Sequence, residues 1–138
     1  YFLADCIFGE NTVNKYHISF FYDIAAQFET LDMVEKLEGK LFIPAHAEPM
    51  EDIKPLVKLN RDKSLEILDV LLEICKKPMH FELVLKKVFE HYDLTMDHAQ
   101  YVLVGSTIRS YLAYLCDNGK VENYVEDNML LWKTVTEE

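Results

Sequence analysis

The stretch that decides the fold runs from Leu41 to Leu56 and reads LFIPAHAEPMEDIKPL. It begins as a short apolar run that ends in Pro44, Ala45 and His46, and it then turns acidic before a helical pattern begins. The apolar run predicts a short buried strand. His46 therefore stands at the carboxyl end of a strand, where open α/β sheets place their functional groups.

Working outward, the sequence predicts a strand, a helix and a strand in the first third of the chain. The first strand is expected at Tyr1–Phe8, YFLADCIF, and a polar turn is expected at Gly9–Lys15. Apolar residues at helical spacing predict a helix over 23–38, with an aspartate as its N-cap and Gly39 as its C-cap. The strand at 40–45 completes one unit of an α/β layer.

Beyond the acidic turn the pattern is helical and then β-prone. Leucines at intervals of three or four predict a long helix, and two further apolar patterns predict two more helices before a hairpin. The expected elements are helices at 50–75, 81–92 and 97–118, the last closed by Gly119, and a hairpin around a turn at 126–128. Three helices followed by a hairpin is the element order of a winged helix-turn-helix. The sequence thus predicts an α+β chain, with one domain at 1–50 and a winged-helix-like domain at 51–138.

The composition limits the possible partners. The 138 residues carry a formal net charge of −10, and half of them are hydrophobic. The hydrophobic fraction permits a buried core, whereas the charge disfavours nonspecific binding to nucleic acid or to a membrane surface, because both are anionic. Three separated cysteines without a C-x-x-C pair favour the reducing cytoplasm. No apolar run approaches the length of a membrane span, so a cytoplasmic protein is expected.

Asp5 is the first candidate for chemistry because it interrupts an apolar strand. A carboxylate in such a strand is expected to be desolvated, and an unpaired buried charge is costly. One interpretation is that Asp5 caps a turn or pairs with a lysine. The other is that it binds a metal. Composition alone favours the first interpretation and leaves both open.

His46 also has two interpretations. A histidine near apolar surface is more often a hydrogen-bonded core residue than a ligand. However, the ends of neighbouring strands lie side by side, so Asp5 and His46 are expected near one rim of the layer. Carboxylate and imidazole are ligands that zinc, iron and manganese share. Two ligands do not complete a site, and the other histidines are scattered without a metal-binding spacing: His17, His80, His91 and His98.

The sequence FLADCIFGENTVNKYHISFFYDIAAQFETLDMVEKLEGKLFIPAHAEP, Phe2–Pro49, resembles the last third of the metallo-β-lactamase superfamily of hydrolases. In that family one strand ends in an aspartate that bridges two metal ions, and a later strand ends in P-x-H-G. The resemblance implies that Asp5 is the bridging ligand and that His46 is the terminal histidine ligand of the second metal. Ala4 and Ala47 stand where the family usually has glycine.

The second half resembles the small winged-helix domain that several members of the superfamily append. KPLVKLNRDKSLEILDVL, residues 54–71, is similar to its long first helix, and Asn60 and Arg61 fall where relatives often carry His-Arg. DHAQYVLVGSTIRSYLAYLCDNGKVE, residues 97–122, is similar to its third helix and the start of its wing. Arg61 is expected to be solvated or to form an ion pair between domains. Gly105 is expected to mark close backbone packing.

The resemblance implies the C-terminal part of a metal-dependent hydrolase, whose longer parent would hold two zinc ions, or iron or manganese, and act on a small molecule. Paired metal ions activate a bridging water and polarise the bond under attack. The family's H-x-H-x-D-H motif is absent from the 138 residues, so this chain alone is expected to be inactive. The alternative is a non-catalytic winged-helix module for interaction, dimerisation or regulation, in which Asp5 and His46 are structural.

The charge of the second half argues against DNA recognition. From Glu51 onward, 11 Lys and Arg residues stand against 16 Asp and Glu residues, and the third helix contains Arg109 as its only Lys or Arg. A helix that reads phosphates and base edges needs more cations. We therefore expect this half to pack against a hydrolase domain or against a second copy in a homodimer.

Overall fold

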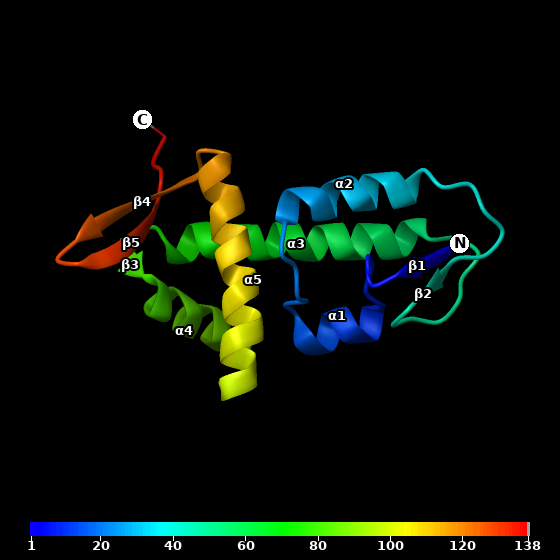
Figure 1. Ribbon diagram of the computed structural model, residues 1–138, viewed down its shortest axis with the longest axis horizontal. Coiled ribbons are helices and arrows are strands. Elements are labelled where there is room, and N and C mark those ends of the chain that lie inside the picture. The colour runs from blue at the N-terminus through cyan, green and yellow to red at the C-terminus, as the bar shows by residue number, and fades with distance from the viewer. Residues whose placement is uncertain (138) are drawn as a thin grey trace. The chain divides into compact units, whose positions relative to one another are not determined.

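The computed structural model describes residues 1–137, and within them the chain forms five helices and two small sheets (Figure 1). Contacts along the chain divide it into two compact units, Tyr1–Glu66 (unit 1) and Ile67–Glu138 (unit 2). The mixture of helices and small sheets agrees with the predicted class. No helix within the described range is both long and apolar enough to pass through a bilayer.

Unit 1 contains the predicted strand, helix and strand. Its elements are β1 (Phe2–Ala4), α1 (Glu10–Tyr16), α2 (Ile24–Glu35), β2 (Ile43–Pro44) and the first part of α3 (Lys54–Ile74). The two strands pair in parallel, with Ala4 opposite Pro44. Because parallel neighbours run in one direction, the chain leaves both strands at the same edge. The predicted order is confirmed, and both strands are shorter than the sequence pattern indicated.

Three local predictions for unit 1 are wrong. The expected strand at Tyr1–Phe8 ends at Ala4, because that residue has φ of 48° and the chain turns there, with Cys6 N donating to Leu3 O at 3.3 Å. The expected polar turn at Gly9–Lys15 contains helix α1, which has no side-chain cap. Helix α2 is capped by Asp23 as predicted, but it ends at Glu35, and its C-cap is Lys36 rather than Gly39.

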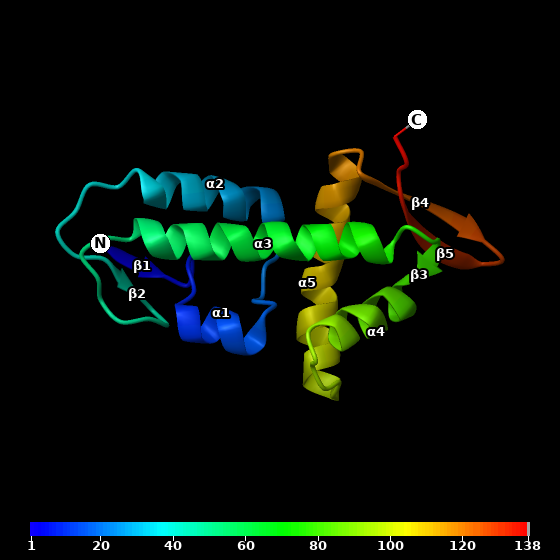
Figure 2. The ribbon, with the colours of Figure 1, turned by 180° about the vertical axis from the view of Figure 1, so that it is seen from behind.

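Helices α2 and α3 lie side by side in both views of unit 1 (Figures 1 and 2). Arg61 of α3 donates to Asp32 at 2.7 Å and to Glu35 at 3.1 Å, both on α2. Arg61 therefore forms an ion pair, and its two partners, like Arg61 itself, belong to unit 1. The apolar core of unit 1 comes from β1 and the loop after it, from α2, from the segments just before β2 and α3, and from α3 itself: Leu3, Ile7, Leu31, Val34, Phe42, Ile53, Leu56 and Val57.

The contacts separate the two units inside α3. Leu56 and Val57 belong to the core of unit 1, so the first half of the helix is held by that unit. The division predicted from sequence, at 1–50 and 51–138, stays a prediction about domain boundaries.

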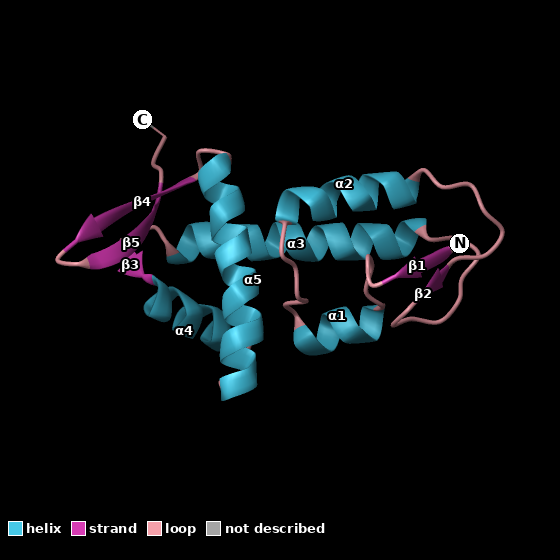
Figure 3. Cartoon of the chain, viewed as in Figure 1, coloured by secondary structure: helices cyan, strands magenta, loops and turns pink. Residues whose placement is uncertain are grey.

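Unit 2 contains the end of α3 and a three-stranded antiparallel sheet of order β3-β5-β4 (Figure 3). Its other elements are β3 (Met79–His80), α4 (Phe81–His91), α5 (His98–Asp117), β4 (Val121–Glu126) and β5 (Met129–Thr134). The predicted helices and hairpin are confirmed. Asp127 and Asn128 both have positive φ, which is the turn that suits a tight hairpin. Strand β3 was not expected from sequence.

One sequence expectation inside α5, for Gly105, can be compared with the structure. A Cβ on Gly105 would lie 3.6 Å from Leu85 Cδ2, which is an ordinary contact, so close packing does not require glycine there. The Thr107 hydroxyl donates to Leu103 O at 3.1 Å within its own helix. Gly105 therefore does not mark a special approach of α5 to its neighbours. The winged-helix assignment of unit 2 stays a prediction.

Candidate functional site

Asp5 and His46 lie next to each other at the ends of β1 and β2. His46 Nε2 is 2.9 Å from Asp5 Oδ1. The pairing of Ala4 with Pro44 explains the contact, because each site residue follows its strand by one or two positions on the same edge. The predicted juxtaposition is thus present in the structure.

The exposure of this pair corrects one expectation. The side chains of His46 and Asp5 are 57% and 73% exposed, so the Asp5 carboxylate is not desolvated. The turn at Ala4 ends the strand before Asp5 and brings the carboxylate to the rim. Asp5 also pairs with a histidine and not with a lysine. Because the Asp5 carboxylate is in contact with solvent, folding carries no cost for desolvating it, and a ligand can reach both the carboxylate and the imidazole.

The backbone that leads to Asp5 is strained at one residue. Ala4 has φ of 48°, in the left-handed region that glycine enters without a Cβ penalty. Its carbonyl accepts a hydrogen bond from Ala45 N at 3.0 Å, which ties the ends of the two strands together. The strained turn therefore aims Asp5 toward His46.

The Phe8 ring lies beside the His46 ring. The two rings are nearly parallel, with an interplanar angle of 5° and centroids 6.4 Å apart. Gly9 lies directly against the backbone after β2, since a Cβ on it would be 2.8 Å from His46 O and 2.9 Å from Ala47 Cβ. The loop after β1 and the loop after β2 are therefore interlocked just beyond the Asp5–His46 pair.

Two amide side chains that the sequence did not single out as site residues hold the loop after β1. Asn60 of α3 forms hydrogen bonds with both backbone groups of Phe8. Gln27 of α2 donates from Nε2 to Cys6 O at 3.2 Å. Asn60 and Gln27 are 5% and 8% exposed. An amide at helical spacing among apolar residues is one sequence signal that could have found them.

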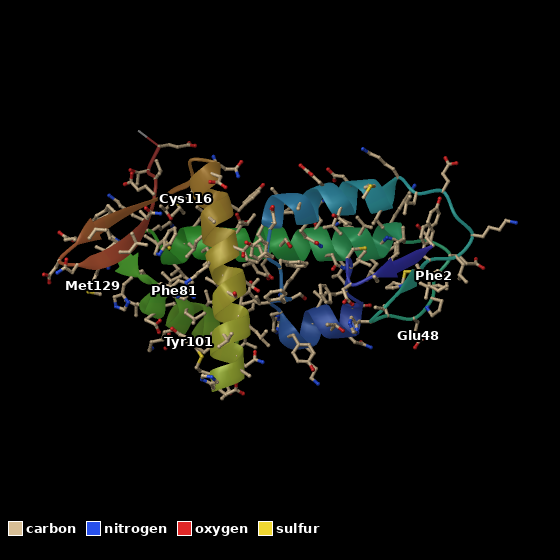
Figure 4. The ribbon with its side chains drawn as sticks, viewed as in Figure 1. Phe2, Glu48, Phe81, Tyr101, Cys116 and Met129 are labelled. Atoms are coloured by element: carbon tan, nitrogen blue, oxygen red, sulfur yellow. The ribbon has the colours of Figure 1, made fainter. Side chains whose placement is uncertain are left out.

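A cleft of about 560 Å³ opens beside His46. Its apolar lining comes from the loop after β2 and from the start of α3: Met50, Pro55, Leu56 and Leu59. Its charged lining is acidic and comes from Glu10, Glu48 and Asp52, with Glu48 on the loop between β2 and α3 (Figure 4). No Lys or Arg lines this cleft. Three carboxylates without a Lys or Arg in the same lining repel negative charge, so the cleft disfavours a ligand that presents an anionic group at its mouth.

The donor set fits part of a metal site. Ligand atoms on one tetrahedral zinc lie roughly 3.4 Å apart when the bonds are about 2.0–2.2 Å. Asp5 Oδ1 and His46 Nε2, at 2.9 Å, need to separate by only a fraction of an ångström to share an ion. Within residues 1–137, no group of three or more His, Cys, Asp or Glu side chains could hold a metal. The chain therefore brings two donors together.

The remaining candidate ligands lie elsewhere or are unsuited. Burial raises the pKa of the Cys6 thiol, so the sulfur is protonated near neutral pH and is a poor ligand. His17 Nδ1 lies 3.0 Å from Lys63 Nζ. The last three histidines belong to unit 2: His80, His91 and His98.

Neither a protein-family model nor a curated protein sequence matches the chain. Solved structures do match it, and two of them cover 96% of its length. A β-lactamase domain protein from Burkholderia ambifaria superposes with a TM-score of 0.75 at 15% identity. A metallo-β-lactamase family protein from Thermus thermophilus superposes with a TM-score of 0.68 at 14% identity. The chain has part of the metallo-β-lactamase fold.

The resemblance to the metallo-β-lactamase superfamily is thereby confirmed at the level of the fold. The chain spans 40% of the length of each of these two solved structures. This extent is consistent with a portion of a metallo-β-lactamase family protein, as the sequence predicted. Identities of 14% and 15% carry no information on substrate.

Proposed function

We propose that this chain is the C-terminal part of a metal-dependent hydrolase of the metallo-β-lactamase superfamily, with Asp5 and His46 as metal ligands. The observation that carries the proposal is the 2.9 Å contact between these side chains at the ends of two parallel strands. Zinc suits a carboxylate and an imidazole, and iron or manganese would accept the same pair. The three free cysteines support a cytoplasmic location.

In this proposal the chain's own residues bind and orient. Asp5 supplies a carboxylate oxygen and His46 supplies Nε2, while Phe8 limits rotation of the imidazole. Two bound metal ions would supply a hydroxide nucleophile and polarise the substrate. A small-molecule substrate would enter through the cleft beside His46, and Glu10, Glu48 and Asp52 would disfavour substrates that present a negative charge there.

The complete reaction is proposed for a longer parent and not for these residues alone. Only two donors come together in the described range, and the H-x-H-x-D-H motif is absent from the sequence. A catalytic zinc site normally uses three protein ligands and a water. The isolated chain is therefore expected to bind zinc weakly and to show no hydrolase activity.

The test is a zinc titration of the purified chain, followed by NMR of the histidine ring signals. Zn²⁺ is expected to shift the ring signals of His46, and Asp5→Asn and His46→Ala are each expected to weaken binding at least about tenfold. His98→Ala, a change in unit 2, is the matched control and should leave binding unchanged. Equal zinc affinity in all four proteins would overturn both ligand assignments.

A second function is favoured by the surface of unit 2. We infer that this unit is a winged-helix-like interaction module that supports a homodimer. The hairpin exposes a group of apolar side chains: Tyr124, Val125, Met129 and Leu130. Exposed apolar groups of this kind are typical of protein contacts. DNA is disfavoured because the Arg109 guanidinium lies 3.7 Å from the centroid of the Phe81 ring and the hairpin carries Glu122, Glu126 and Asp127.

The dimer is tested by sedimentation of the wild type and of Val125→Asp. The side chain of Val125 is 69% exposed, so the change should leave the fold intact. A dimer that dissociates in the variant supports the interaction module. A wild-type monomer at all concentrations would remove the dimer from the proposal.

A further inference from the structure

Asn60 forms an unusual set of contacts for a helix residue. Phe8 N donates to Asn60 Oδ1 at 3.0 Å, and Asn60 Nδ2 donates to Phe8 O at 2.8 Å. Nδ2 also donates to Leu56 O at 2.9 Å, one turn earlier in α3. The side chain is 5% exposed, so these bonds are shielded from water. One amide thus satisfies both backbone groups of one loop residue, as a neighbouring strand would.

The residue held in this way touches the candidate site. The Phe8 ring is nearly parallel to the His46 ring, and it also makes an edge-on contact with Phe21 at a centroid distance of 5.6 Å. Both backbone groups of Phe8 are hydrogen-bonded to Asn60 of α3. These bonds fix the position of the Phe8 backbone, and the backbone position in turn determines where the ring lies beside the imidazole. Asn60 therefore acts on His46 through Phe8 without touching the site itself.

The residues on either side of Phe8 in the loop after β1 are also held by contacts with the rest of unit 1. Phe8 lies between Cys6, whose carbonyl accepts from Gln27, and Gly9, whose backbone is in contact with His46 O and Ala47. The loop is held at three points along Cys6–Gly9, while the Asp5 carboxylate that precedes it stays exposed. Such an arrangement fixes the direction of a ligand and leaves its oxygen atoms free.

We propose that Asn60 is a positioning residue for the Asp5–His46 pair. This inference rests on the proposed metal-binding function, because positioning matters only if the pair binds a metal. The contacts of Phe8 are the physical link between Asn60 and His46. By fixing the loop after β1 to α3, Asn60 keeps the carboxylate and the imidazole within a fraction of an ångström of the separation that one ion requires. Without the amide, the two donors must be ordered when the metal binds, and the entropy of that ordering lowers the affinity.

Asn60→Leu tests the proposal because it keeps the approximate size of the side chain and removes all three hydrogen bonds. The expected results are a shift of the His46 ring signals in the NMR spectrum without metal, shifts of the amide signals of residues 5–9, and a roughly tenfold to hundredfold loss of Zn²⁺ affinity. Val57→Ala, a core change three residues earlier on α3, is the control for lost stability. It should leave the ring signals and the zinc affinity of the folded protein unchanged.

A second variant keeps the test decisive if Asn60→Leu does not fold. Phe8→Leu retains the backbone bonds to Asn60 but lacks the aromatic ring, so it should shift the His46 ring signals while the amide signals of Asp5 change little. A folded Asn60 variant with wild-type His46 signals and wild-type zinc affinity would overturn the positioning role. If the wild type binds no Zn²⁺, the metal proposal fails by itself, and a shift of the His46 signals in Asn60→Leu still supports the coupling through Phe8.

Discussion

Gly9 and Ala47 are packed so closely that a Cβ on Gly9 would lie 2.9 Å from Ala47 Cβ and 2.8 Å from His46 O. These residues belong to the loops that follow β1 and β2, so their contact locks the two loops together beside the Asp5–His46 pair. Gly9 is thus needed for its lack of a side chain, although its own φ is in the ordinary range. The geometry of the candidate site depends on backbone contact as much as on its two polar side chains.

Gly9→Ala should displace the loop that carries His46. The backbone atoms that a methyl group would meet cannot rotate away, so we expect a loss of about 1–3 kcal/mol in the free energy of unfolding and a shift of the His46 ring signals. Urea denaturation and NMR measure the two effects. Gly105→Ala is the matched control, since its Cβ would meet Leu85 Cδ2 at an ordinary 3.6 Å, and it should gain up to about 1 kcal/mol from helix propensity. Equal effects of the two changes would contradict the close packing at Gly9.

Ala4→Gly should relieve backbone strain. Ala4 has φ of 48°, where a Cβ is unfavourable, and the relief exceeds the extra entropy that glycine brings to the unfolded chain. The expected gain in the free energy of unfolding is about 0.5 kcal/mol. Ala25→Gly, on the exposed side of α2, should instead lose about 1 kcal/mol. The idea fails if Ala4→Gly destabilises the chain as much as Ala25→Gly does.

Arg61→Met should weaken the attachment of α2 to α3. The guanidinium binds both Asp32 and Glu35, and its side chain is 25% exposed, so the loss in the free energy of unfolding should be about 1 kcal/mol or less. The difference from wild type should shrink in about 1 M NaCl because salt screens the pair. Lys58→Met, which removes the exposed pair with Asp62 on the same helix, should cost about 0.3 kcal/mol. A salt-independent loss at Arg61 would indicate packing of its aliphatic stem instead.

Cys75 should make stability depend on alkaline pH. Burial raises the pKa of this thiol from its usual value of 9.0 to about 11, with a smaller contribution from the charge of Cys116. Between these pH values the unfolded chain loses its thiol proton while the folded chain keeps it, so stability is full below pH 9 and falls as the pH rises toward 11. The difference in unfolding free energy between wild type and Cys75→Ala should narrow over this window. A constant difference from about pH 8 to about pH 11 would rule out the burial of a neutral thiol as the cause.

The sequence by itself determined the elements whose signals are local. Helix α5 follows from its apolar spacing and its cap, since Asp97 Oδ1 accepts from Gln100 N at 2.8 Å. Gly119, with φ of 69°, ends the same segment as predicted. Period and capping act within a few residues, so no knowledge of distant contacts is needed to recognise them. The same local logic placed His46 at the end of a strand.

Tertiary structure alone decided the features that depend on partners far along the chain. Helix α1 has no side-chain cap and buries only Val13, so nothing local distinguishes it from a turn. Strand β3 exists because Met79 pairs with Trp132. The loop after β1 has its shape because Asn60, 52 residues from Phe8, binds both of its backbone groups. The sequence placed His46 at a strand end and Asp5 near the same rim, whereas the turn at Ala4, the long-range hydrogen bonds of Asn60 and the contact of Gly9 with Ala47 decided how closely the two meet.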